Sequence, residues 1–411
     1  MEILFGKIKE YLKGVSDIST GSYPYLGENV DIKIDLDRFH NISNNSFISV
    51  EFTKDVVKPT LTVDKGLVDY IKQMEFIINK DELFIKEKNN LLLKSTNHTP
   101  TLKIPTQELK NLKISGTGNF ITDNTVIGKI EVKGTGKIEI NNFTGSNVSS
   151  ESTNDILINN ILAESVSISH KGIGDFLIQA GKIEQATIKA TGTGNVNLNI
   201  LMKEVNLTTS AIGDINLGVI ENNLTIKGNQ TGNISFQGPV KSVVDVDLSG
   251  IGNITGSNID TDSIYIKSSG TGNVELLGKS KYSKIYCLGI GDVNLGDLLS
   301  TRVEIVNKGT GDTTVFVENM VDVNLAGIGD VNIFGDKSKL ITNKEINGMG
   351  DVCFISKKIT KTQDVFVQEN QILKNTEVLK DTTVIENNKE LISQDNNKAT
   401  KKESIANKLR I

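Results

Sequence analysis

The sequence predicts an all-β fold in which short strands coil into a parallel β-helix, a solenoid of stacked turns. A corner of the form Gly-x-Gly-Asp or Gly-x-Gly-Asn returns throughout the range 111–354. Apolar and polar residues alternate on both sides of each corner, as in "IYIKSSGTGNVELLG". Alternation on either side of a tight turn is typical of strand, turn and strand. Its recurrence at a nearly fixed interval of about 19 residues is typical of a solenoid.

The second glycine of each corner marks the repeat. It stands at Gly118, Gly136, Gly174, Gly194, Gly213, Gly232, Gly252, Gly272, Gly291, Gly311, Gly329 and Gly350. One degenerate corner, "STND", has Asn154 in this place. We expect glycine here because a sharp reversal requires a positive φ, which is unfavourable for a residue with a side chain. The Asp or Asn that follows is expected to bond nearby backbone N–H groups and to cap the turn.

The middle residue of the corner alternates between isoleucine and threonine from residue 173 onward. The series is Ile173, Thr193, Ile212, Thr231, Ile251, Thr271, Ile290, Thr310, Ile328 and Met349. If like residues stack on like, one coil contains about 39 residues and two corners, with isoleucine along one edge and threonine along the other. We predict this arrangement, and one corner per coil is the alternative.

Composition divides the chain into four segments. Residues 1–45 are predicted to hold an amphipathic helix and a lead-in, since Leu4, Ile8 and Leu12 share one helical face. Residues 46–110 contain alternating stretches such as "SFISVEF" and are predicted to be a β segment that caps the solenoid. Residues 111–354 are the repeat array. Residues 355–411 lack glycine, carry charges of both signs and are predicted to be a mobile tail.

Composition also excludes several classes of function. The formal net charge is −5 and basic residues do not cluster, so no nucleic-acid partner is expected. Cys287 and Cys353 lack the spacing of a disulfide framework or metal site, and we expect both to be buried. No apolar run is long enough for a transmembrane helix, and the first residues lack the features of a cleaved signal peptide. By sequence alone the chain is expected in the cytoplasm, and its N-terminal helix is expected to pack over one end of the fold or to contact a membrane peripherally.

The corners "SGTGNFI" (115–121), "HKGIGDFLI" (170–178) and "LAGIGDVNI" (325–333) resemble those of a known family. This family is the head GIN domain of putative auto-transporter adhesins, and the resemblance covers about residues 46–354. The resemblance implies a right-handed β-helix allied to the pectin-lyase-like superfold, with a role in adhesion at the cell envelope. A glycan or another cell-surface ligand would then be the partner. The chain departs from the family pattern in its Ile or Thr middle residues, where the family has Ser, and in lacking an export signal.

The acids that follow the corners are the candidates for a metal site. Asp175, Asp214, Asp292 and Asp330 are expected mainly to cap turns, as members of a ladder of carboxylate and amide side chains. The alternative is calcium between neighbouring carboxylates, because a cation would relieve their mutual repulsion. No other cofactor is expected.

No catalytic constellation appears in the repeat array. Its one histidine, His170, and its one arginine, Arg302, are expected to be exposed strand or loop residues. No Ser/His/Asp order, zinc-ligand spacing or phosphate-binding loop is present. We therefore predict a non-enzymatic structural or adhesion-type module that binds through its sheet faces or its polar threonine edge. A carbohydrate-active lyase or hydrolase and an intracellular scaffold are the alternatives.

Three lysines precede threonine-type corners at nearly the same offset. Lys189, Lys227 and Lys267 are expected to lie about one coil apart in a row. We interpret this row as a solubilising face. A basic stripe for an anionic glycan or lipid surface is the alternative.

Overall fold

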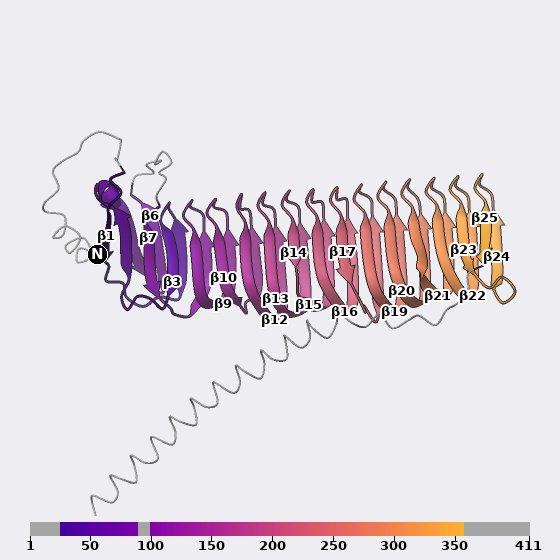
Figure 1. The fold of residues 1–411 in the computed structure, drawn as a ribbon, viewed down its shortest axis with the longest axis horizontal. Coiled ribbons are helices and arrows are strands. Elements are labelled where there is room, and N and C mark those ends of the chain that lie inside the picture. Colours follow the sequence, from indigo (N-terminus) through magenta and orange to yellow (C-terminus); the bar gives the residue numbers. More distant parts are fainter. Residues whose placement is uncertain (1–24, 89–98, 357–411) are drawn as a thin grey trace, which may run out of the picture. The chain divides into compact units, whose positions relative to one another are not determined.

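Two strand segments and two turns make up each coil of a β-solenoid of about 12 turns. The computed structural model describes residues 25–88 and 99–356, which belong to one compact unit, Met1–Lys358. In Figure 1 the coils of this unit follow one another along a single axis, from the indigo N-terminal strands to the yellow β25. The predicted N-terminal amphipathic helix and almost all of the predicted mobile tail lie outside the described residues. The predicted all-β solenoid is confirmed.

Parallel strands form the body of the solenoid, and each pairs with the equivalent segment one coil away. These strands are β2 (Asn41–Asn45), β3 (Ser49–Thr53), β6 (Glu82–Glu87), β7 (Thr101–Pro105), β8 (Leu109–Ile114), β9 (Phe120–Val132), β10 (Ile138–Phe143), β11 (Asn147–Ser150), β12 (Ile156–His170), β13 (Phe176–Ala190), β14 (Val196–Leu198), β15 (Leu201–Thr209), β16 (Ile215–Gly228), β17 (Ile234–Gln237), β18 (Val243–Leu248), β19 (Ile254–Ser268), β20 (Val274–Cys287), β21 (Val293–Asn307), β22 (Thr313–Leu325), β23 (Val331–Gly335), β24 (Ile341–Ile346) and β25 (Val352–Ser356). Long strands such as β19 contain both the segment that follows one corner and the segment that precedes the next.

Antiparallel strands close the N-terminal end of the solenoid. Strand β5 (Met74–Asn79) pairs with β6, β4 (Thr60–Asp64) pairs with β7, and β1 (Asn29–Lys33) pairs with β4. The 3-10 helix η1 (Lys65–Leu67) and the short helix α2 (Val68–Ile71) connect β4 to β5. Leu67, Val68, Tyr70 and Ile71 of these two helices are buried and belong to the hydrophobic core. Across residues 25–88 and 99–356, no helix combines the length and the apolar character needed to cross a membrane.

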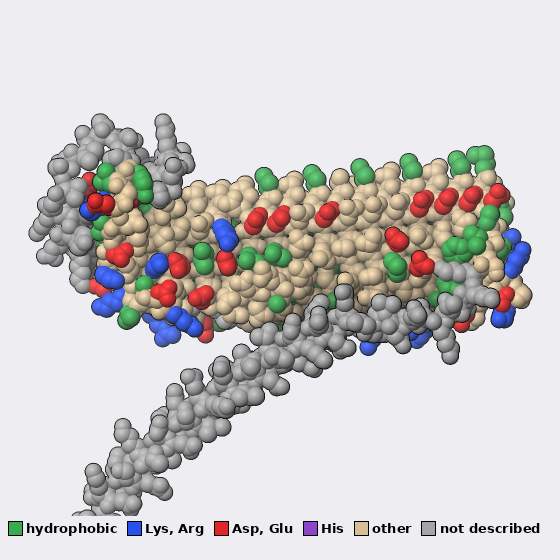
Figure 2. Space-filling model, in the orientation of Figure 1, with side chains coloured by type: hydrophobic (Ala, Val, Ile, Leu, Met, Phe, Trp, Pro, Cys, Tyr) green, Lys and Arg blue, Asp and Glu red, His purple; other side chains and the backbone are tan. Residues whose placement is uncertain are grey.

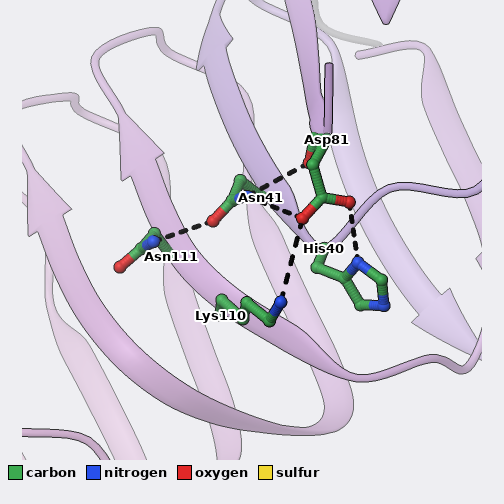
Figure 3. A network of polar contacts seen from close by, with 5 residues as sticks. All are labelled: His40, Asn41, Asp81, Lys110 and Asn111. Atoms are coloured by element: carbon green, nitrogen blue, oxygen red, sulfur yellow. Dashed lines mark hydrogen bonds and ion pairs between the residues drawn. The ribbon is translucent and has the colours of Figure 1, made fainter. Parts of the chain in front are cut away.

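A network of polar contacts fastens this cap to the adjoining coils (Figure 3). The Asp81 carboxylate lies in the turn between β5 and β6, where its Oδ1 is 2.7 Å from His40 Nδ1 and its Oδ2 is 4.0 Å from Lys110 Nζ. Asn41 Nδ2 donates to the Asp81 carbonyl oxygen at 3.1 Å, and Asn111 Nδ2 donates to Asn41 Oδ1 at 2.8 Å. The hydrogen bond with His40 lowers the pKa of Asp81 below its ordinary value. The network therefore joins the cap turn to β2 and β8 through a carboxylate that stays ionised at neutral pH.

Each coil contains one glycine corner, not the two that the alternation predicts. Strand β20 pairs with β19 so that Tyr286 lies beside Lys267, the residue at the same offset before the preceding corner. The Thr271 N–H donates to the Gly250 carbonyl at 3.0 Å, and the Ile290 N–H donates to the Gly270 carbonyl at 2.9 Å. Isoleucine and threonine corners therefore alternate along a single edge, and the two-edge prediction is wrong. Their side chains face solvent, where stacking like on like gains little, whereas backbone hydrogen bonds pair every corner with the next.

The neighbouring coil, rather than a positive φ, requires glycine at the corners. None of the twelve second-position glycines has a positive φ, contrary to the prediction. A Cβ atom on Gly272 would lie 2.1 Å from the carbonyl oxygen of Gly252 in the preceding coil. Only a residue without a side chain allows two backbones to approach so closely. Positive φ values occur instead in the other turn of the coil, for example 128° at Gly181 and 139° at Gly278.

Side chains alternate between core and solvent along each segment, and the corner preserves this alternation. At one corner Ser268 and Val274 are both 0% exposed, whereas Thr271 is exposed. Near a corner, therefore, residues at an even distance from the second glycine face the core. The core itself is a continuous stack of small aliphatic side chains that extends through all the coils.

This alternation determines whether His170, Cys287 and Cys353 are buried or exposed. His170, four residues before Gly174, is only 1% exposed, so the prediction of an exposed histidine is wrong. Cys287, also four residues before a second glycine, is buried as expected. Cys353 lies an odd number of residues beyond the last corner and is exposed, contrary to the prediction.

Candidate functional site: the corner edge

The middle residues of the corners form an exposed edge along the solenoid, which we call the corner edge. Ile251 and Ile290 are each 65% exposed and Ile328 is 53% exposed, while Thr271 between them is exposed as well. Figure 2 shows hydrophobic side chains at regular intervals along one edge, beside a row of acidic side chains. Because isoleucine and threonine alternate, the apolar side chains are two coils, or ~9.6 Å, apart.

A shallow groove runs along the corner edge over its last six corners. Its volume is about 760 Å³. The groove lies between the middle residues and the outward residues two positions earlier, such as Leu288 and Lys308. The first-position glycines lie between these two rows, so backbone forms the floor and no side chain fills the space. The result is a long, open surface with apolar and hydroxyl-bearing walls.

The Asp or Asn after each corner forms a hydrogen-bonded ladder on the same edge. The Asn195 N–H donates to Asp175 Oδ1 at 2.8 Å, and the Asp214 N–H donates to Asn195 Oδ1 at 2.9 Å. The same bond recurs at every coil from Asp155 to Asp351. Asp and Asn are interchangeable in this role because each supplies one side-chain oxygen as the acceptor. This is the capping role that the sequence predicts.

The four candidate metal-binding aspartates are not direct neighbours. They are Asp175 and Asp214, with Asn195 between them, and Asp292 and Asp330, with Asp312 between them. The C-terminal part of the ladder is consequently a run of four acids that ends at Asp351. Among the residues that the structure describes, no group of three or more His, Cys, Asp or Glu side chains could hold a metal ion. Calcium at the ladder stays the alternative to the predicted capping role.

The three lysines of the predicted row lie two coils apart, not one. Lys189, Thr208, Lys227, Asp247 and Lys267 follow one another in a single column, each paired with the next. The Nζ atom of Lys267 lies 3.0 Å from the Asp247 carboxylate. The column therefore lacks the adjacent positive charges of a basic stripe, because one coil per corner inserts another residue between each pair of lysines.

Sequence reasoning missed that apolar and hydroxyl-bearing residues share one edge. A usable signal lay between the corners, where Gly181, Gly218 and Gly278 interrupt the alternation and all have positive φ. Glycine is the residue that most readily adopts such a reversal. A second reversal inside each repeat is enough to close a coil. These glycines, rather than the alternation of the middle residue, therefore indicate the length of the coil.

Comparison with known proteins supports one family. The model described as "Putative auto-transporter adhesin, head GIN domain" matches residues 38–239 and 220–336, well over half of the chain. No curated protein matches the chain.

Solved structures with similarity to the chain cover 80% of it. They include a putative adhesin from Bacteroides fragilis NCTC 9343 (14% identity, 99% of that chain covered, TM-score 0.21). A putative adhesin from Parabacteroides merdae ATCC 43184 is 15% identical, with 97% of that chain covered and a TM-score of 0.22. A protein from Parabacteroides distasonis ATCC 8503, described as a putative lipid binding protein, is 15% identical, with 98% of that chain covered and a TM-score of 0.20.

These identities and TM-scores carry no argument about a ligand. The family match, in contrast, spans the strands from β2 to β23, which include most of the cap, the coils and most of the corner edge. On that match the chain belongs to the family of putative auto-transporter adhesins with a head GIN domain.

Proposed function

We propose that the chain is a non-catalytic adhesion module that binds a surface-borne ligand along its corner edge. The observation that supports this most is the unbroken edge itself, where exposed isoleucines recur beside a groove of about 760 Å³. Exposed apolar side chains gathered on one surface and bordered by polar residues mark interaction sites. The rigid ladder holds this surface in place, so little ordering of the protein is needed when a ligand binds.

The ligand is expected to combine apolar groups with positive charge. Asp292, Asp312, Asp330 and Asp351 follow one another along the edge next to the apolar residues. A row of like charges creates a potential that attracts groups of opposite sign. The same row repels anionic lipid headgroups, so it favours a cationic ligand over a negatively charged bilayer.

The absence of catalysis is part of the proposal. The family description refers to adhesion and to no reaction. Asp292, Asp312 and Asp330 of the corner edge already accept backbone hydrogen bonds in the ladder. Acid–base cleavage of a glycan uses two carboxylates on opposite sides of the scissile bond, whereas these carboxylates lie in one row on one side.

Replacing Ile251, Ile290 and Ile328 together by threonine should weaken binding to an alkyl monolayer with terminal amines, measured by surface plasmon resonance. Threonine occupies the same position in the neighbouring coils, so the backbone accommodates it. Each change removes apolar surface from the contact, and burying one methylene group contributes a favourable free energy of ~0.8 kcal/mol. We expect the affinity to fall by about ten-fold or more.

A matched control replaces three exposed apolar residues away from the corner edge: Ile127→Thr, Leu162→Thr and Leu277→Thr. This variant should bind like the unmodified chain, and an equal loss in both triple variants would contradict the proposal.

Asp312→Asn with Asp330→Asn keeps the ladder acceptors but removes two charges. It should weaken binding to the amine-terminated surface and leave binding to a hydroxyl-terminated alkyl surface unchanged.

A further inference from the structure

Rare residue types gather on one sheet face, apart from the corner edge. All three tyrosines of residues 111–354 and the one arginine of that range lie on adjacent coils. We call Tyr265, Tyr282, Tyr286 and Arg302 the tyrosine patch. Pairing places Tyr282 next to Arg302 in the following coil, and Tyr265 diagonally next to Tyr282. In a chain built by repetition, such a departure confined to three coils marks a local specialisation.

The rings of the tyrosine patch are held in a defined arrangement at the surface. Tyr265 is 41% exposed, and its ring centroid lies 6.0 Å from that of Tyr282, with the planes at 72°. The Arg302 guanidinium lies 5.9 Å from the Tyr282 ring centroid. Lys284 Nζ lies 5.5 Å from the Tyr286 ring centroid. Aromatic and cation–π contacts of this kind fix the orientation of the rings before any ligand arrives.

Charges within the tyrosine patch compensate one another. Arg302 Nη2 lies 2.7 Å from Glu304 Oε1 and 3.1 Å from Asp322 Oδ2. Lys284 Nζ lies 3.3 Å from Glu304 Oε2. Two cations thus face two carboxylates, so the patch offers no excess charge to an ion. A guanidinium has about five N–H donors and a carboxylate about four acceptor positions, so both kinds of group keep capacity for a further ligand.

The solenoid does not need aromatic side chains at these positions. The column that contains Tyr265 has Thr225 two coils earlier, and the column that contains Tyr286 has Thr208 four coils earlier. The coils with threonine make the same backbone pairs as the coils with tyrosine. The exposed Tyr265 ring and the half-buried Tyr282 and Tyr286 rings are therefore not required by the backbone pairing of the stack.

We propose that the tyrosine patch binds the sugar rings of a neutral glycan. One face of a pyranose ring presents C–H bonds with partial positive charge, which pack against the negative face of an aromatic ring. The hydroxyl groups at its rim match the mixed donors and acceptors of Arg302, Glu304 and Asp322. A few fixed polar groups around an apolar platform give a ligand its orientation.

A protein partner fits this surface less well. A stable protein interface covers ~800 Å² on each side and has a core depleted of charged residues. Around the tyrosine patch charged and amide-bearing outward residues include Asp245, Lys267 and Asn324, while Val306 beside Tyr286 and Met320 beside Arg302 are half-buried apolar residues. Desolvation of the charged and amide groups by a broad partner would be unfavourable, whereas a narrow glycan covers the rings and leaves the surroundings in water.

The test measures binding of the full chain to an array of neutral oligosaccharides of glucose, galactose, mannose and xylose, to sulfated oligosaccharides on the same array, and to mucin before and after enzymatic deglycosylation. We expect binding to at least one of them. Tyr265→Thr combined with Tyr286→Thr should lower the affinity by about ten-fold or more, since both stacking platforms are lost. Tyr265→Phe combined with Tyr286→Phe keeps the rings and should stay within about three-fold of the unmodified chain. Thr225→Ala is the matched control in the column that contains Tyr265, and it should leave the affinity for the oligosaccharides unchanged.

Four outcomes would overturn the proposal: no binding to any neutral oligosaccharide, binding only to sulfated ones, equal losses in the threonine and phenylalanine variants, and retention on mucin after enzymatic deglycosylation. The last result would indicate a protein partner. The tyrosine patch is separate from the corner edge. The variant with Ile251, Ile290 and Ile328 replaced by threonine should therefore bind the array as the unmodified chain does. A fifth outcome, loss of array binding in that variant alone, would also overturn the proposal, because it would implicate the corner edge and not the tyrosine patch. Unchanged denaturation midpoints show that the variants are folded.

Discussion

Replacing Gly272 by alanine is expected to destabilise the solenoid by about 3–5 kcal/mol, a large fraction of the stability of an ordinary domain. The added Cβ would lie 2.1 Å from the Gly252 carbonyl oxygen and 2.7 Å from the Ile251 carbonyl oxygen. Both obstacles are backbone atoms, so no side-chain rotation relieves the clash. The two coils must separate, which breaks the hydrogen bonds that join β18 to β19 before the corner and β19 to β20 after it.

Urea denaturation followed by circular dichroism checks this expectation, and hydrogen exchange locates the damage. Solenoid repeats contact mainly their neighbours, so hydrogen-exchange protection should fall most in β18, β19 and β20 and least in the N-terminal cap. Thr271→Ala is the matched control, because its exposed side chain should change stability by no more than about 0.5 kcal/mol. Similar effects of the Gly272 and Thr271 substitutions would contradict the close-approach explanation.

Acidification from pH 7 to pH 5 is expected to destabilise the unmodified chain more than the His170→Leu variant. His170 is 1% exposed, and its Nε2 has no hydrogen-bond partner in the part of the chain that the structure describes. Burial lowers the pKa of His170 below its ordinary value of 6.5, with partial opposition from Asp175. The folded state therefore keeps this ring neutral at a pH at which the unfolded chain already binds a proton.

The sign of the effect follows from proton linkage. Above pH 6.5 the ring is neutral in both states and contributes no pH dependence. As the pH falls below that value, the unfolded chain gains a proton and stability is lost, by up to about 1.4 kcal/mol per pH unit, until the folded-state pKa is reached. Leucine occupies the same inward column at Leu248 and Leu325, so the variant should fold. Urea denaturation midpoints of the unmodified chain and the His170→Leu variant, measured at pH 5, 6, 7 and 8, test this expectation. If the midpoints of the two proteins change with pH in parallel, the expectation is contradicted.

The corner shows which features of the fold can be predicted from the sequence and which cannot. The alternation around "SSGTGNVELL" predicts two strand segments and a turn, and both are present as the end of β19 and the start of β20. The same stretch suggests glycine for its φ, yet its φ is not positive, and the reason for glycine is a carbonyl in the preceding coil. A clash between coils has no local signal in the sequence, because it arises only when the stack has formed.

The candidate sites likewise include residues that a local sequence signal identifies and residues that only the stacking of coils brings together. Asn195 and Asp214 could be recognised as turn-capping residues from their positions after the corners, since that role depends on residue type and spacing. Tyr265 and Arg302 are far apart in the sequence, and no local pattern links them. They become part of one patch only because two coils bring them to the same face.

By itself the sequence determined the repeat unit, its strand segments, its glycine corners and its ladder of Asp and Asn, because these depend on local periodicity and side-chain chemistry. Only the tertiary structure decided that one corner completes a coil, that His170 is enclosed, and that isoleucine and threonine share an edge. Register between coils is set by backbone hydrogen bonds ~4.8 Å apart, and the exposed alternation of side chains has too small an energetic effect to override them.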